Sequence, residues 1–142
     1  MQTVADILGS KGRELWTVKP TDTVLEALRV MAEHDIGAVA VLDGEKLVGI
    51  FTERDYARKV VLIGRASRDS AVRDIMTHKV MCVAPDRPVN ECMALMTEHR
   101  LRHLPVLHQK RVVGIVSIGD LVKATIEEQE FTITQLQSYV TG

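Results

Sequence analysis

The sequence predicts an α+β fold made of two pseudosymmetric β-α-β-β-α repeats that pack face to face. The first observation is that the stretch Leu47–Asp55 recurs in kind, 65 residues later, as Val112–Asp120. The second is that each copy alternates short β-branched runs, typical of buried strands, with helix-like apolar spacing. The third is size, because a three-stranded sheet with two helices is too small to bury its own apolar face. Two such units are therefore expected to share one core.

The repeat extends well beyond these two stretches. Pro20 aligns with Pro85, and the alignment continues without a gap to Asp55 and Asp120. Upstream the offset is 68, so the first copy carries three extra residues around Gly9–Arg13, which we expect to form a surface loop. The predicted organisation is a first repeat at 1–64, a polar linker at 65–71, a second repeat at 72–126 and a tail at 127–142. The tail is expected to be helical and amphipathic, with an apolar side that needs a partner.

Strands and turns are predicted in corresponding places of the two copies. Each copy is expected to open with a strand that ends before a proline, and to continue after a helix with a β-hairpin. The expected first strands are Leu15–Val18 and Val80–Val83, and the expected second strands are Ala38–Leu42 and His103–Leu107. Asp43-Gly44 is a good turn signal between the second and third strands, and Gln109-Lys110 is a weaker one.

The helices also correspond between the copies. Thr23 and Glu26 form a predicted capping box, and Pro88 is expected in the first turn of the matching helix. Each of these helices has one apolar stripe, made of Val24, Leu28 and Met31 or of Val89, Met93 and Met96. The next helix is expected to begin after Thr52 and to end near Gly64, and its counterpart to begin at Ser117.

Composition excludes several classes of protein. The chain has 142 residues, a formal net charge of −1 and only 4% aromatic residues, which argues against a nucleic-acid binder. Charged residues near the N-terminus and the lack of a long apolar run argue against a signal peptide or membrane span, so we expect a cytoplasmic protein. Cys82 and Cys92 form no metal or redox spacing and are expected to be buried, reduced thiols.

The repeated motif [TS]-x-x-D follows the predicted third strand in both copies. Thr52 and Asp55 form the first motif, and Ser117 and Asp120 form the second. Side-chain oxygens, unpaired backbone N–H groups and the positive end of a helix dipole would meet there, where a ribose and its phosphates could bind. A simple helix-capping box is the alternative for either motif.

The tandem β-α-β-β-α units, each ending in V-G-I-x-[TS]-x-x-D, resemble a pair of CBS (cystathionine β-synthase) domains, called a Bateman module. The Arg102-His-Leu-Pro-Val106 stretch and the Val-x-Asp-Ile starts add to the resemblance, which covers roughly Val4 to Ala124. It implies a sensor of adenosine-containing ligands such as AMP, ADP or ATP, and in some members NAD or S-adenosylmethionine. Such modules commonly pair into homodimers and usually regulate an enzyme, channel or transporter on the same chain, whereas here the regulated protein is unknown.

The resemblance implies two ligand sites, each combining the first two strands of one repeat with the [TS]-x-x-D turn of the other. The residues of one site would be Thr17, Val18, Ile36, Gly37 and Ala38 with Ser117, Gly119 and Asp120. Those of the other would be Cys82, Val83, Leu101, Arg102 and His103 with Thr52, Arg54 and Asp55. The aspartates would accept hydrogen bonds from the ribose hydroxyls.

The two sites are expected to differ in charge. The second gathers Arg54, Arg102 and His103, which suit an anionic phosphate chain. The first has Gly37, Ala38 and Gly119 at the matching positions, so we expect it to bind phosphates weakly or to take only the adenosine part of a ligand. A ligand with two nucleoside ends, such as NAD(H), is a further hypothesis.

Other functions remain open from the sequence alone. The chain could be a structural dimerisation module with empty, degenerate sites, or a small enzyme or redox sensor that uses Cys82. His99 and His103 have a helical spacing that could suit zinc, but the helix is expected to end between them. No nucleophile–base pair or paired-carboxylate site stands out, so we do not expect an enzyme.

Overall fold

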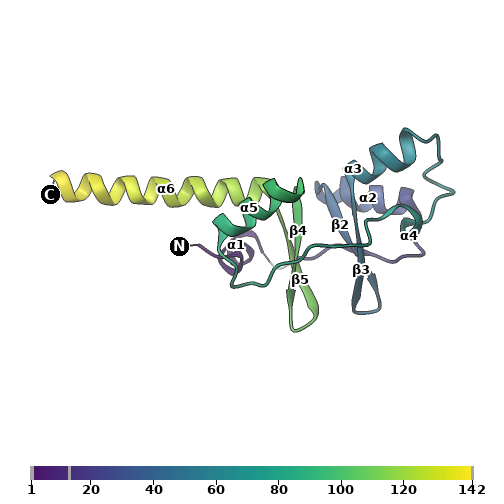
Figure 1. The fold of residues 1–142 in the computed structure, drawn as a ribbon, viewed down its shortest axis with the longest axis horizontal. Helices are drawn as coiled ribbons and strands as arrows, with labels where there is room; N and C mark the ends of the chain where they lie inside the picture. Colours follow the sequence, from purple (N-terminus) through teal and green to yellow (C-terminus); the bar gives the residue numbers. More distant parts are fainter. Residues whose placement is uncertain (1, 13, 142) are drawn as a thin grey trace. The chain divides into compact units, whose positions relative to one another are not determined.

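The computed structural model describes residues 2–12 and 14–141, and these form two compact units. Unit 1 contains residues 2–12, 82–108 and 113–141, and unit 2 contains residues 14–81 and 109–112. Both units combine α-helices with β-strands (Figure 1). The predicted α+β class is confirmed.

Unit 2 contains a three-stranded sheet in the order β1-β2-β3. Strand β1 runs parallel to β2, and β2 pairs antiparallel with β3. The elements in chain order are β1 (Thr17–Val18), α2 (Val24–His34), β2 (Ala38–Asp43), β3 (Lys46–Thr52), α3 (Glu53–Tyr56), a π-helical turn η1 (Ala57–Val61) and α4 (Val72–Ile75). Its core is formed around the fully buried side chains of Val24, Val41 and Phe51.

Strands β4 (His103–His108) and β5 (Arg111–Ser117) form a hairpin that lies in unit 1 except for residues 109–112, which are grouped with unit 2. The helices of unit 1 are α1 (Val4–Lys11), α5 (Val89–His99) and the long α6 (Ile118–Thr141). Gln109 and Lys110 form the turn of the hairpin with φ angles of 52° and 66°, the positive values that two-residue hairpin turns require. The predicted tail at 127–142 lies within α6 up to Thr141, so the last predicted helix and the tail are one element.

The compact units do not coincide with the predicted repeats. The short helix at the start of each repeat, α1 or α4, belongs to the unit that contains the rest of the other repeat. Helix α1 comes before the first repeat but belongs to unit 1, where Ala5 N–H donates to the carbonyl of Pro85 at 2.8 Å. Helix α4 begins the second repeat but belongs to unit 2, where Val72 N–H donates to the carbonyl of Asp22 at 2.8 Å. Each repeat therefore receives the leading helix of the other. Neither leading helix was among the predicted elements.

The predicted first strands are only partly correct. Leu15–Val18 is reduced to the two residues of β1, and Val80–Val83 is not a strand. Among the described residues, only Val83 bridges β4, where its N–H donates to the carbonyl of Pro105 at 3.0 Å. Apolar, β-branched runs fit a strand, but a strand forms only along the length where a neighbouring backbone pairs with it.

Three details of the helices also differ from prediction. The capping box of Thr23 and Glu26 is confirmed, but Pro88 is the N-cap of α5 and not part of its first turn. The extra residues of the first copy are not a loop, because α1 continues to Lys11; Arg13 lies outside the described residues. The helix after Thr52 changes to a π-helical turn at Ala57, which widens its last turn before Gly64.

The repeated glycine of V-G-I marks where each leading helix packs against the third strand. A Cβ atom on Gly49 would collide with the Sδ atom of Met76 and lie 3.0 Å from the carbonyl oxygen of Thr77. In unit 1, a Cβ atom on Gly114 would lie 2.6 Å from Cδ2 of Leu8. Leu8 and Met76 are themselves equivalent in the repeat, so both glycines serve the same close approach.

We expect Gly49→Ala to lower the free energy of unfolding by about 1–3 kcal/mol, because overpacking forces neighbouring groups to move. Gly114→Ala is the matched variant and should cost less, since Leu8 meets it with a side chain whereas Thr77 meets Gly49 with backbone. Urea unfolding of both variants measures the difference. An equal or greater loss for Gly114→Ala would contradict this explanation.

Candidate functional site

The two [TS]-x-x-D motifs form helix N-termini at the ends of β3 and β5. Thr52 caps α3, where its N–H donates to Oδ2 of Asp55 at 3.1 Å and its Oγ1 accepts from Asp55 N–H at 3.1 Å. Ser117 makes the same pair of contacts with Asp120, at 2.8 Å and 3.1 Å. Both motifs are therefore capping boxes in the structure, the alternative that the sequence left open.

The carboxylate of Asp55 makes additional contacts inside unit 2. The hydroxyl of Thr77 donates to Oδ1 at 3.1 Å, and Lys59 Nζ lies 3.1 Å from the same oxygen. Lys59 also donates to the carbonyl of Ile75 at 3.1 Å. The side chain of Asp55 is only 8% exposed. Both of its oxygens are thus occupied by groups of the protein.

The carboxylate of Asp120 is held differently. Lys11 Nζ lies 2.7 Å from Oδ2 and also donates to the carbonyl of Ile115 at 2.9 Å. The side chain of Asp120 is 24% exposed and that of Lys11 is 39% exposed. Burial raises the pKa of Asp120, but hydrogen bonds from Lys11 and Ser117 and the lysine charge outweigh it and hold the pKa below its ordinary value. Asp120 is therefore an ionised, partly accessible carboxylate at neutral pH.

The two turns thus use different residues to pair the aspartate with a cation. Gly9 and Ala124 of unit 1 occupy the positions that Thr77 and Lys59 occupy in unit 2. Lys11, which belongs to the three extra residues of the first copy, supplies the cation in their place. The sequence expectation had given no cation to the site that contains Asp120.

Lys59, Lys11 and Thr77, which contact the two aspartates, were not among the predicted site residues. The sequence contained a signal for the two lysines. Lys59 lies four residues after Asp55, the spacing at which side chains meet on a helix. Lys11 falls within the insertion that distinguishes the two copies. Thr77 had no such signal, because its contact depends on how α4 packs against β3.

The second-strand residues lie beside the turn of their own repeat. Ala38 pairs with Thr52, and the N–H of Glu53 donates to the carbonyl of Gly37 at 3.1 Å. In unit 1, the N–H of Ile118 donates to the carbonyl of Arg102 at 2.9 Å. The combination of strands from one repeat with the turn of the other stays a prediction.

The remaining predicted site residues differ in exposure. Val18 and Val83 are buried, whereas Ile36, Cys82, Leu101 and His103 are partly exposed. Exposed positions are occupied by Thr17, Arg54, Arg102 and Gly119. The two arginines expected to meet phosphates therefore present their side chains at the surface of their units.

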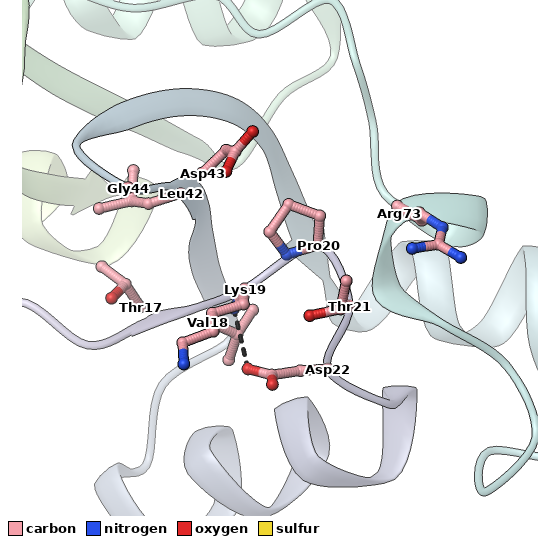
Figure 2. A pocket seen from close by; sticks show the side chains of 10 residues that line it. All are labelled: Thr17, Val18, Lys19, Pro20, Thr21, Asp22, Leu42, Asp43, Gly44 and Arg73. Atoms are coloured by element: carbon pink, nitrogen blue, oxygen red, sulfur yellow. Dashed lines mark hydrogen bonds between the residues drawn. The ribbon is translucent and has the colours of Figure 1, made fainter.

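A pocket of about 540 Å³ lies at the opposite end of β2 from Thr52 (Figure 2). Its wall includes Thr17 and Val18 of β1 and the hairpin turn at Gly44. Two cations, Lys19 and Arg73, and two carboxylates also line it. Asp22, one of the carboxylates, accepts a hydrogen bond from the backbone N–H of Lys19 at 2.8 Å. The pocket is thus separate from the Asp55 turn, although it includes Thr17 and Val18, two of the residues predicted for the site that contains Asp120.

The cysteines do not form an activated thiol. Burial raises the pKa of the Cys82 thiol, which lowers the fraction of reactive thiolate. Cys92 is fully buried in α5, and burial raises its pKa as well. Within residues 2–12 and 14–141, no cluster of three or more His, Cys, Asp or Glu residues could hold a metal ion. No helix in the same ranges has both the length and the apolar character to cross a membrane.

Comparison with known proteins identifies a family and several relatives of this chain. The CBS domain model matches residues 4–62 and 72–127. A mitochondrial CBS domain-containing protein of Arabidopsis thaliana, CBSX3, is 40% identical over 99% of this chain and 72% of its own length. A putative signal-transduction protein with CBS domains from Burkholderia ambifaria has a solved structure with a TM-score of 0.86. It is 53% identical over 90% of this chain and 96% of its own.

A third relative has been solved with ligands. The CBS domain pair of protein MJ0100, in complex with 5′-methylthioadenosine and S-adenosyl-L-methionine, has a TM-score of 0.78 and 28% identity. It covers 90% of this chain and 98% of its own. The two matches to the family model and the extent of these similarities show that the chain belongs to the CBS domain family and carries two CBS domains.

Proposed function

We propose that this chain is a regulatory module that binds adenosine-containing ligands at its two [TS]-x-x-D turns. The observation that carries the proposal is the Asp120 turn, an ionised and partly exposed carboxylate fixed at a helix N-terminus beside a lysine. A carboxylate accepts hydrogen bonds from ribose hydroxyls, and the helix N-terminus and the lysine suit an anion. The adenosine ligands of the MJ0100 structure support the same class of ligand.

AMP, ADP, ATP and NAD(H) are the ligands we propose. The module would act without catalysis, because a ligand that binds one arrangement of the two repeats better than another shifts the population toward it. We further propose that the module works as a homodimer in the cytoplasm and regulates a separate protein.

A thermal-shift screen tests the proposal. The protein is heated alone and with AMP, ADP, ATP, NAD⁺, NADH and S-adenosylmethionine, each at a concentration well above the expected dissociation constant. A ligand at about a hundred times its Kd should add roughly 2.7 kcal/mol of stability and raise the melting temperature by several degrees. No shift with any of the six ligands would contradict the proposed function.

Lys11 gives a sharper prediction about ligand class. Its ammonium group lies 2.7 Å from Oδ2 of Asp120, beside the turn where we propose that a nucleotide binds. In Lys11→Met we expect the affinity for AMP to fall by about tenfold, because a charge-assisted hydrogen bond to phosphate is lost, while adenosine binds as well as before or better. Calorimetric titration with both compounds measures this, and Lys123→Met on the exposed surface of α6 is the control. An equal loss for adenosine and AMP would contradict a phosphate-binding role for Lys11.

A structural module with empty sites is the second candidate, and the Asp55 turn favours it. The carboxylate there is almost fully buried and both oxygens already have partners, so a ribose would have to displace Thr77 or Lys59. Under this alternative the repeats serve dimerisation alone. The thermal-shift screen separates the two candidates.

A further inference from the structure

The described side chains in the second half of α6 are not buried by unit 1. Near the start of the helix, Leu121 and Ala124 are buried, but every residue from 129 to 140 is exposed. In unit 1 this part of the helix projects beyond α1 and α5 (Figure 1). Most helical stability in proteins comes from packing of an apolar face, so the exposed apolar face of this segment favours another surface to pack against.

The exposed residues of α6 form a heptad stripe. Apolar residues recur at alternating intervals of four and three from Val122 to Val140, and only one polar residue interrupts them. In coiled-coil notation the d positions are Val122, Gln129 and Leu136, and the a positions are Ile126, Ile133 and Val140. The apolar members are 40–82% exposed. All three a positions are β-branched and one d position is leucine, choices that favour a parallel two-stranded coiled coil.

Gln129 identifies the partner as a second copy of the same helix. In a parallel, in-register pair, the two Gln129 amides face each other and can hydrogen-bond across the seam. In an antiparallel pair, or against an unrelated apolar helix, each amide would be buried without a partner, which is costly. A single polar residue at a core position is a known means of fixing register and strand number.

The flanking positions place no like charges together. In the parallel pair, Thr125 of one helix faces Glu130 of the other, and Thr132 faces Gln137. The hydroxyls of both threonines are already hydrogen-bonded within the helix, to the carbonyls of Leu121 at 2.9 Å and Glu128 at 3.0 Å. Thr132 is exposed, so its methyl group is available to cover the seam, whereas the hydroxyl of Thr125 also lies 3.3 Å from Sδ of Met93 in α5.

We propose that two copies of this chain associate through a parallel, in-register coiled coil over residues 122–140. The seam with its flanks has twelve positions per chain, fewer than the roughly 20–30 residues a side of a standard interface. We therefore expect a dimer that dissociates in roughly the micromolar range. The inference names a surface for the homodimer of the proposed function, rests on that part of it, and does not depend on nucleotide binding.

Sedimentation velocity over a range of protein concentrations tests the surface. We expect the parent chain to dimerise and Ile133→Glu to weaken the dimer at least tenfold. Phe131→Glu, which adds the same charge on the outer face of the same helix, should leave it unchanged. Far-UV circular dichroism confirms that both variants fold. If Ile133→Glu dimerises like the parent, the coiled coil is wrong and the homodimer uses another surface; if the parent stays monomeric, the homodimer itself is wrong.

Disulfide trapping tests the register. Under mild oxidation, Ile133→Cys should form a covalent dimer in high yield, because equivalent a positions face each other in a parallel pair. Phe131→Cys should not exceed the parent chain, which carries only Cys82 and Cys92. Equal yields for the two variants would overturn the in-register arrangement.

Discussion

Replacing Asp55 with alanine should lower the free energy of unfolding by about 2–4 kcal/mol and the melting temperature by roughly 10 °C. The variant keeps Thr52 as the N-cap of α3 but removes the carboxylate that accepts from the N–H of Thr52. It also leaves the hydroxyl of Thr77 and the ammonium of Lys59 without the carboxylate that they share. Urea and thermal unfolding, each without ligand, measure the loss. The prediction treats Asp55 first as a structural residue of unit 2.

Glu26→Ala provides the matched control for this loss. Glu26 closes a capping box at the start of α2, where its carboxylate accepts a hydrogen bond from the N–H of Thr23 in an exposed setting. Its loss should cost about 1 kcal/mol or less. If Asp55→Ala costs no more than Glu26→Ala, the contacts of Thr77 and Lys59 add nothing to stability and the structural role is wrong.

Replacing Asp120 with asparagine should weaken the binding of AMP by on the order of 10–100-fold while the protein remains folded. Asparagine keeps an oxygen for the N–H of Ser117, but it removes the charge that strengthens the hydrogen bonds to ribose, each worth about 1.5–3 kcal/mol. Isothermal titration calorimetry measures the change in affinity. Circular dichroism at the same temperature shows that the variant is folded.

The control is Asp6→Asn, which changes a capping carboxylate in the same unit. Asp6 accepts from the N–H of Thr3 at 2.9 Å at the start of α1, but its helix does not follow a strand of the repeat. Its loss should leave AMP affinity unchanged. An Asp120→Asn variant that binds AMP like the parent would show that the carboxylate is only a helix cap.

Local sequence signals accounted for much of the fold. The hairpins, the helices α2 and α5 and both capping motifs follow from apolar periodicity, turn residues and [TS]-x-x-[DE] spacing, all of which act within a few residues. The exchange of α1 and α4 between repeats could not be predicted this way. It depends on contacts such as that of Leu8 with Gly114, between residues far apart in the chain.

The same distinction applies to the candidate site. The two aspartates could be predicted because their motif occurs twice and because their hydrogen bonds to Thr52 and Ser117 are local. The different partners of the two carboxylates could not be predicted from local sequence. Lys11 contacts Asp120 although more than a hundred residues separate them, and Thr77 contacts Asp55 from outside α3. The expectation that the site containing Asp55 is the richer in charge counted Arg54, Arg102 and His103 and missed the lysine beside Asp120.

Amide chemical-shift mapping by NMR, with AMP titrated into ¹⁵N-labelled protein, tests the central claim most directly. If the repeated turns hold a nucleoside by its ribose hydroxyls, the largest perturbations fall on the amides of 117–120 and 52–55, and Asp120→Asn removes those at 117–120. Perturbations confined to the pocket around Thr17–Asp22, or none at saturating AMP, would contradict it.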